Sequence, residues 1–200
     1  MGTRHLIAVY NQGEYRVAQY GQWDGYPTGQ GVDVLAFLSD PEKRDSLREK
    51  SLNTGWITTE AHKDLYAGLG IDPESEFISM ADADKFKDAY PWLSRDCGSD
   101  ILKYVADNET GKPILLKDSL SFAGDSLFCE WVYVVDFDKG VLEVYKGFNT
   151  SPVDPENRFA NFKEEDSGEY HPVQLKESFS LDALPTKAEF VAALEPQDEE

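Results

Sequence analysis

The run from residue 128 to 147, FCEWVYVVDFDKGVLEVYKG, restricts the fold more than any other part of this chain. Its two halves are rich in β-branched and aromatic residues, and a polar turn containing glycine joins them, which is the pattern of a β-hairpin. Trp131 and Tyr133 would lie on one face of the first strand, and Val132 and Val134 on the other. Because both faces are apolar, we expect this hairpin to lie inside a sheet that is covered on both sides.

The rest of the chain adds strands and helices to this hairpin. Residues 5–10 (HLIAVY) and 14–20 (EYRVAQY) flank an Asn-Gln-Gly turn and predict a second antiparallel hairpin. Residues 171–181 alternate as one more strand. This order indicates an α+β fold with a mainly antiparallel sheet of about five strands and flanking helices. It would also suit the four-layer αββα sandwich of N-terminal-nucleophile hydrolases. Helices are predicted over residues 32–38, 40–52, 58–68, 79–90, 99–105 and 186–194, from apolar spacing and capping residues.

The length favours one folded unit. With 200 residues of which 40% are hydrophobic, the chain can bury one core. We expect a single domain over residues 1–195, with a helical insertion at about 32–107, and a frayed acidic tail over 196–200.

The charge limits the classes of partner. Nineteen basic and 38 acidic residues give a formal net charge of −19, which repels nucleic acid and anionic membrane surfaces. A basic protein partner would suit such a surface. No segment has the roughly 20 apolar residues of a membrane span, and we expect a cytoplasmic protein with reduced cysteines. Nothing in the pattern indicates a metal site or a cofactor, and the oligomeric state is left open.

Residues 19–31, QYGQWDGYPTGQG, form the candidate binding loop. The first hairpin would bring this loop beside the start of the chain, and the resulting group mixes aromatic, amide, acidic and basic side chains, as a pocket for a small polar ligand requires. In this hypothesis Asp24 or His5 would move a proton. The ligand-binding residues would be Trp23 and Tyr26 for stacking, Gln19 and Gln22 for hydrogen bonding, and Arg4 for neutralising an anionic group.

A structural interpretation of the same residues is also open. Trp23 and Tyr26 would then close the end of the core, and the glycines would serve tight turns, since their spacing matches neither a P-loop nor a dinucleotide fingerprint. Candidate nucleophiles are few. Thr3 would need an additional cleavage to become N-terminal. Cys97 precedes a predicted helix, but the neighbouring acidic residues oppose a thiolate there.

The segments GTRHLIAV, VAQYGQWDGYPTGQG and CEWVYVVDFDKGVLEVYKGF resemble a family of small fungal, phage and bacterial proteins. The resemblance covers the start of the chain and the central hairpin, and it implies no activity because none is assigned to that family. Two hypotheses therefore rest on the residues alone. The first is a protein that binds a small polar ligand, with hydrolase-like acid/base chemistry as an extension. The alternative is a non-enzymatic acidic interaction or inhibitor protein, whose binding should weaken with rising salt.

Overall fold

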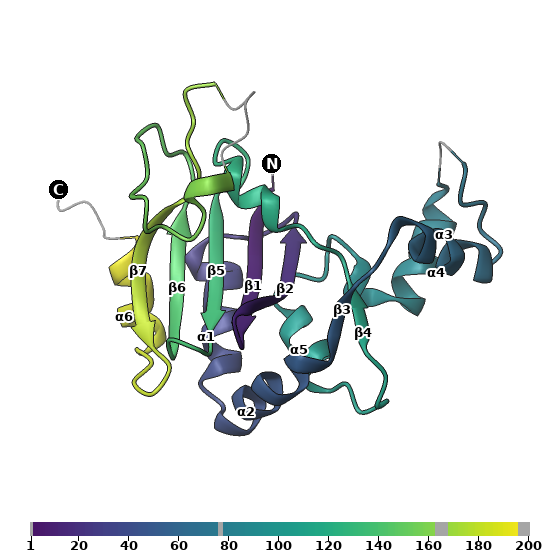
Figure 1. Cartoon of the computed structure of the whole chain (residues 1–200), viewed down its shortest axis with the longest axis horizontal. Coiled ribbons are helices and arrows are strands. Elements are labelled where there is room, and N and C mark those ends of the chain that lie inside the picture. Colours follow the sequence, from purple (N-terminus) through teal and green to yellow (C-terminus); the bar gives the residue numbers. More distant parts are fainter. Residues whose placement is uncertain (1, 76–77, 163–167, 196–200) are drawn as a thin grey trace.

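A computed structural model describes residues 2–75, 78–162 and 168–195 and shows an α+β fold around one five-stranded sheet. The strand order is β2-β1-β5-β6-β7 (Figure 1). β1 and β5 pair in parallel, whereas the other neighbours pair antiparallel. Two hairpins therefore lie side by side, and the predicted fold class is confirmed. The strands are β1 (His5–Asn11), β2 (Glu14–Gly21), β5 (Trp131–Asp136), β6 (Val141–Lys146) and β7 (Gln174–Ser180).

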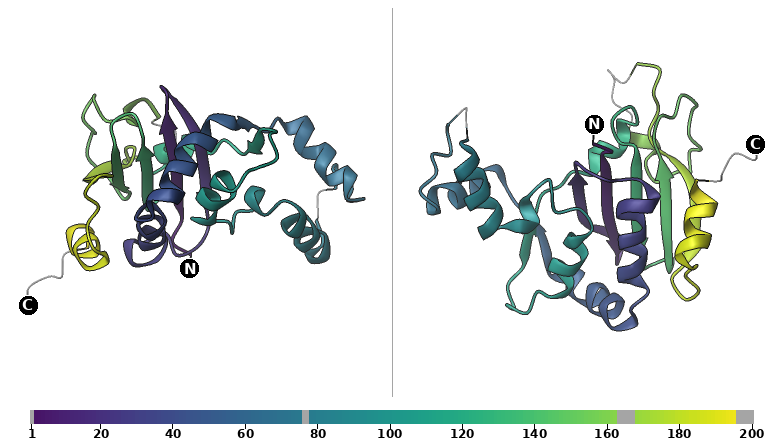
Figure 2. Two further views of the ribbon diagram at one scale, coloured as in Figure 1. Left: turned by 90° about the horizontal axis from the view of Figure 1, so that it is seen from below. Right: turned by 180° about the vertical axis from the view of Figure 1, so that it is seen from behind.

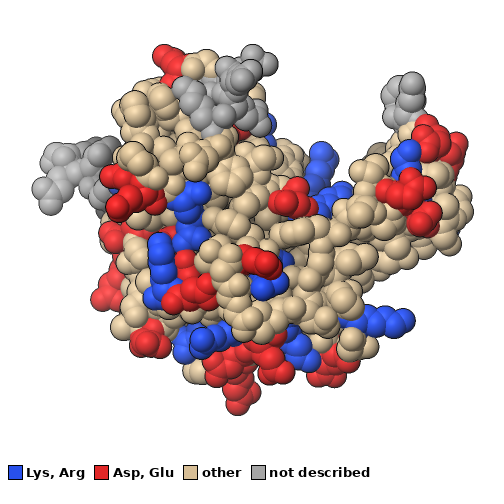
Figure 3. Space-filling view, viewed as in Figure 1, with Lys and Arg blue, Asp and Glu red and all other residues tan. Residues whose placement is uncertain are grey.

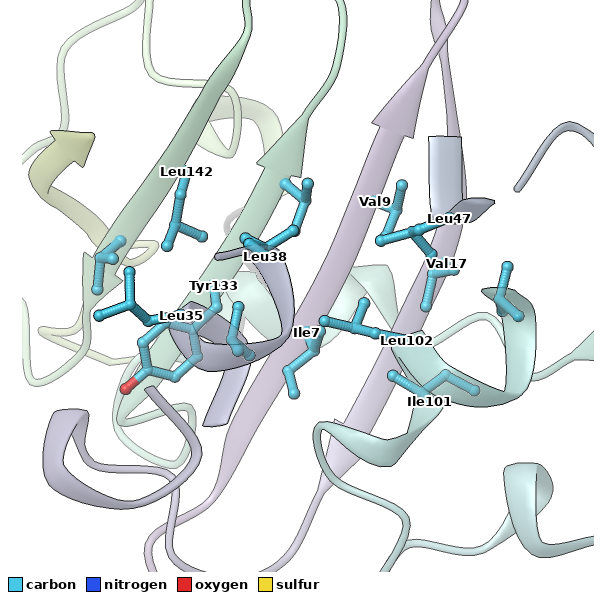
Figure 4. Close-up of a cluster of buried hydrophobic side chains, with 14 of the residues drawn as sticks. Ile7, Val9, Val17, Leu35, Leu38, Leu47, Ile101, Leu102, Tyr133 and Leu142 are labelled. Carbon is cyan, nitrogen blue, oxygen red and sulfur yellow. The ribbon is translucent and has the colours of Figure 1, made fainter. Parts of the chain in front are cut away.

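Both faces of the central hairpin are covered, as its sequence predicts. Every residue of β5 is buried. Helices cover one face of the sheet (Figure 2), where Leu38 and Leu102 pack toward Ile7 (Figure 4). Short 3₁₀ turns and the loop that carries Phe159 cover the opposite face. The covering helices are α1 (Val32–Leu38), α2 (Pro41–Lys50), α5 (Asp100–Ala106) and α6 (Lys187–Leu194).

An arm projects beyond β2 (Figures 1 and 2). It starts at a small parallel pair, β3 (Thr54–Trp56) and β4 (Ile114–Leu116), and carries α3 (Thr59–Gly68) and α4 (Met80–Ala89). These elements have their own apolar cluster, formed by Ile71, Phe86 and Leu93. Of the helices predicted between residues 32 and 107, α1, α2 and α5 belong to the main core, and only α3 and α4 stand apart.

Three other predictions have different outcomes. The last strand is confirmed as β7, but it is a largely exposed edge strand. The αββα sandwich stays unconfirmed, because the second described sheet consists of two three-residue strands. The predicted acidic tail, 196–200, lies outside the described residues. In the part of the chain that is described, we find no helix long and apolar enough to cross a membrane.

Candidate functional site

The glycine-rich loop is held rigidly at the end of the sheet. The buried hydroxyl of Tyr133 on β5 donates a hydrogen bond of 2.8 Å to the carbonyl of Gly25. A π-helical turn, Pro27–Gly31, then leads into α1. Because this hydrogen bond joins the loop to the buried strand β5, the backbone that carries the loop side chains is held in one position, as a binding site requires.

The hairpin register brings the chain start beside this loop, but it separates Arg4 from the other predicted residues. His5 pairs with Gly21, as the predicted hairpin requires. The side chain of His5 lies on the face of the helices, together with Ile7. Arg4 precedes it, and the guanidinium of Arg4 lies 4.4 Å from the ring centre of Phe128, which is not part of the loop. The anion-neutralising role of Arg4 stays a prediction, and the contact with Phe128 does not support it.

His5 is enclosed by the glycines of the loop. Its side chain is 1% exposed, and a Cβ atom at Gly21 would lie 2.1 Å from its Cε1 atom. Gly25 also lies close to it, since a Cβ there would lie 2.6 Å from the His5 Cβ. Burial lowers the pKa of His5 to about 4. The imidazole is thus neutral at pH 7 and shielded from a ligand, which suits a packing role better than proton transfer.

The two predicted glutamines form hydrogen bonds between the loop and the segment at the base of the arm. The Gln19 amide donates to the carbonyl of Ser94 at 3.0 Å, and the backbone N–H of Gln22 donates to the carbonyl of Arg95 at 3.1 Å. The Gln22 side chain accepts a hydrogen bond of 2.5 Å from the Tyr20 hydroxyl. These amides position the loop against residues 94–96.

Trp23, Asp24 and Tyr26 remain accessible. Trp23 is 48% exposed, and its indole N–H donates to the Asp96 carboxylate at 3.0 Å. Tyr26 donates its hydroxyl to Asp24 at 3.1 Å. The structure therefore brings together the aromatic and acidic members of the predicted group on one surface, next to the segment that carries Asp96.

Asp24 has a left-handed backbone, with φ of 55°. Asp and Asn tolerate this conformation, whereas most other residues lose about 1–2 kcal/mol in it. We expect Asp24→Ala to lower the free energy of unfolding by about 1 kcal/mol and Asp24→Asn to leave it nearly unchanged, as measured by urea denaturation. Equal losses in the two variants would mean that the carboxylate, and not the backbone, supplies the stability.

A cavity of about 350 Å³ has Asp96 in its wall. We call it the basic cavity. Basic side chains from three separate segments line it, and the Tyr66 and Phe86 rings, stacked at 4.1 Å, form part of its wall. Figure 3 shows acidic and basic side chains spread over this face, with one basic group at the base of the notch between arm and sheet and an acidic group beside it. The residues of the basic cavity that matter here are Tyr66, Phe86, Lys87, Arg95, Asp96 and Lys117.

Lys117 is the distinctive group of the basic cavity. It is half-buried, and within the described residues its ammonium has no hydrogen-bond or ion-pair partner. Desolvation lowers its pKa. Its charge also lowers the pKa of the neighbouring His62, after the larger effect of burial. Lys87, in contrast, forms an ion pair of 3.1 Å with Asp96. An unpaired, partly buried cation beside an open cavity is an unsatisfied site for an anion.

Sequence reasoning missed these basic residues because no local pattern joins them. Lys87 lies on α4, Arg95 follows the next turn, and Lys117 follows β4. Only the fold of the arm brings them to one cavity. The sequence offered one signal for these residues: lysines and arginines are half as frequent as acidic residues in this chain, so each of them is a candidate for a specific role.

The remaining chemical groups do not indicate a nucleophile or a metal centre. Burial, with a smaller contribution from Asp100, raises the pKa of Cys97 to about 12. Burial also raises the pKa of Cys129 far above its usual range. Both thiols are therefore protonated at neutral pH. Among the described residues, no group of three or more His, Cys, Asp or Glu side chains is placed to hold a metal ion.

Comparison of the chain with protein-family models, with curated proteins and with solved structures finds no match.

Proposed function

We propose that this protein binds a small anionic ligand with a planar part, in the basic cavity and against the neighbouring Trp23. The observation that carries the proposal is the ammonium of Lys117 at the cavity wall, which has no hydrogen-bond or ion-pair partner in the part of the chain that the structure describes. A ligand phosphate or carboxylate would supply the partner that this cation lacks.

Charge supports the same ligand class. The chain has twice as many acidic as basic residues, yet Lys87, Arg95 and Lys117 line one cavity. One of the carboxylates at the wall, Asp96, is already engaged by Lys87 and by the indole of Trp23. Asp84 is the other carboxylate of the wall, so three basic groups stand against two acidic ones, and an incoming anion would balance the remaining positive charge.

Aromatic groups support a planar part in the ligand. Trp23 lies one hydrogen bond away from the cavity wall through Asp96, and almost half of its surface is exposed. Aromatic walls with a few convergent polar groups are typical of small-molecule sites. In this proposal the loop keeps the stacking role expected for Trp23 and Tyr26, and Arg95 and Lys117 take the role expected for Arg4.

We propose binding and assign no reaction. Hydrolase-like chemistry would need an accessible base, and His5 is enclosed and neutral at pH 7. Asp24 is the accessible acid of the loop, but its carboxylate accepts a hydrogen bond from Tyr26. A proton-transfer role for Asp24 would be seen as a loss of turnover in Asp24→Asn once a ligand is known.

Thermal denaturation with inorganic phosphate, benzoate and a nucleoside monophosphate tests the proposal. A ligand at a hundred times its Kd stabilises the folded state by about 2.7 kcal/mol, which for a chain of this size is about 5–10 °C in Tm. We expect the compound that combines a phosphate with a planar base to give the largest shift.

A pair of matched variants tests whether the Tm shift comes from binding in the basic cavity. Lys117→Met should weaken binding about tenfold by removing a charge-assisted contact, as measured by calorimetry. Lys103→Met on α5 makes the same change in net charge on an exposed helix surface, and it should leave the affinity unchanged. If all three compounds leave Tm unaltered, or if both variants bind equally well, the proposal is wrong. Capture of a basic protein in a salt-sensitive complex would then favour the acidic interaction hypothesis.

A further inference from the structure

A second cavity lies between the arm and α5, and its walls are apolar. Its volume is about 690 Å³, and we call it the aromatic cavity. Leu93, Ile114 and Leu115 supply aliphatic contacts. Three aromatic residues complete the wall, namely Tyr90, Trp92 and Tyr104. Leu93 also lines the basic cavity, but none of the basic residues considered above lines this one.

The three aromatic residues are neighbours in the cavity wall, and Trp92 lies between the other two. The ring centres of Tyr90 and Trp92 lie 5.9 Å apart at an angle of 84°, and those of Trp92 and Tyr104 lie 6.2 Å apart at 57°. A cation is attracted by a ring when it lies over the ring face within about 6 Å of its centre, and ring centres this close together allow one cation to lie within that distance of two rings. The indole N–H of Trp92 donates to the carbonyl of Leu115 at 3.2 Å and fixes the central ring.

The rim carries a negative balance of charge. Asp107 and Glu109 reach the cavity, and within the described chain neither carboxylate forms an ion pair or a side-chain hydrogen bond. Lys112 is the basic residue of the rim. The two free carboxylates, in a chain with a net charge of −19, attract a cationic ligand and disfavour an anionic one.

We propose that the aromatic cavity binds a methylated or quaternary ammonium group attached to a small organic body. Such a cation is weakly hydrated, so it can enter an apolar cavity, and the faces of the rings attract it electrostatically. The aliphatic part of the wall would cover its methyl groups, and the rim carboxylates would face its charge. This site is separate from the one in the proposed function and does not depend on it.

A pair of isosteric probes separates attraction of a cation from simple apolar burial. Choline and 3,3-dimethylbutan-1-ol have nearly the same shape, but only choline is charged. We expect choline to bind about tenfold more tightly or better, because the cation–π term is lost in the neutral alcohol. Proton NMR should show the trimethylammonium signal shifted upfield by the rings.

Variants of Tyr104 locate the binding. Tyr104→Leu keeps the apolar volume but removes the ring face, so it should weaken choline about tenfold and leave the neutral alcohol within about threefold. Tyr104→Phe keeps the face and should retain choline binding. Asp107→Asn combined with Glu109→Gln gives a further readout, a weaker choline affinity with a smaller salt dependence. Equal affinities for the two probes, no choline binding to the wild type, or loss of choline in Tyr104→Phe as large as in Tyr104→Leu would each overturn the proposal.

Discussion

Arg158→Met is expected to lower the free energy of unfolding by about 3–5 kcal/mol, because it removes the buried cation that two buried carboxylates share. The guanidinium forms ion pairs with Asp136 and, at 2.7 Å, with Glu143. The side chains of these two acids are only 2% and 6% exposed. The Tyr145 hydroxyl also donates to Glu143 at 2.7 Å. Chemical denaturation of the wild type and the variant would measure the loss.

Lys139→Met is the matched control for this prediction. Lys139 also pairs with Glu143, at 3.2 Å, but its side chain is 64% exposed. Its removal should therefore change the stability by less than about 1 kcal/mol. In the Arg158→Met background, Glu143→Gln should recover part of the loss because it removes one of the stranded charges. A similar small effect for both single variants would show that the acids find water or another partner.

The stability of the wild type is expected to fall by about 3 kcal/mol between pH 6.5 and pH 4 through His5 alone. Burial lowers the pKa of His5 from 6.5 in the unfolded chain to about 4 in the folded one. Below pH 6.5 the unfolded state binds a proton that the folded state resists, so stability is lost progressively until the folded pKa is reached. Above pH 6.5 the contribution is complete and constant.

His5→Gln isolates this contribution. The carboxylates of the chain titrate in the same range, but they titrate in the variant as well, so the difference between the two stability curves reports His5. That difference should change with pH between 6.5 and 4 and be flat above. A constant difference over the whole range would show that the buried imidazole keeps its ordinary pKa, and therefore that water reaches it.

The sequence predicted the elements better than their arrangement. Both hairpins and the six helices follow from local alternation, caps and turns, such as the Thr186 and Glu189 capping box at α6. The parallel pairing of β1 with β5 has no local signal, since its partners lie 126 residues apart. The short strands β3 and β4 were missed because three residues are too few for a period to be visible.

The candidate site could be predicted only in part, for the same reason. The hairpin register places His5 next to Gly21, as expected from the turn. Strand alternation sends Arg4 toward Phe128 instead, and this was overlooked because Arg4 precedes the regular strand. Lys117 could not be linked to Trp23, since only the tertiary structure brings the arm beside the loop.

The parallel contact between β1 and β5 also affects the order of events in folding. The residues at the start of the chain that fill the middle of the sheet, such as Leu6 and Val9, can reach their final neighbours only after the chain has been made as far as β5. Closing so long a loop slows the search for the native state. During synthesis the N-terminal hairpin therefore keeps apolar surface exposed until β5 has emerged, which makes this segment prone to aggregation in that interval.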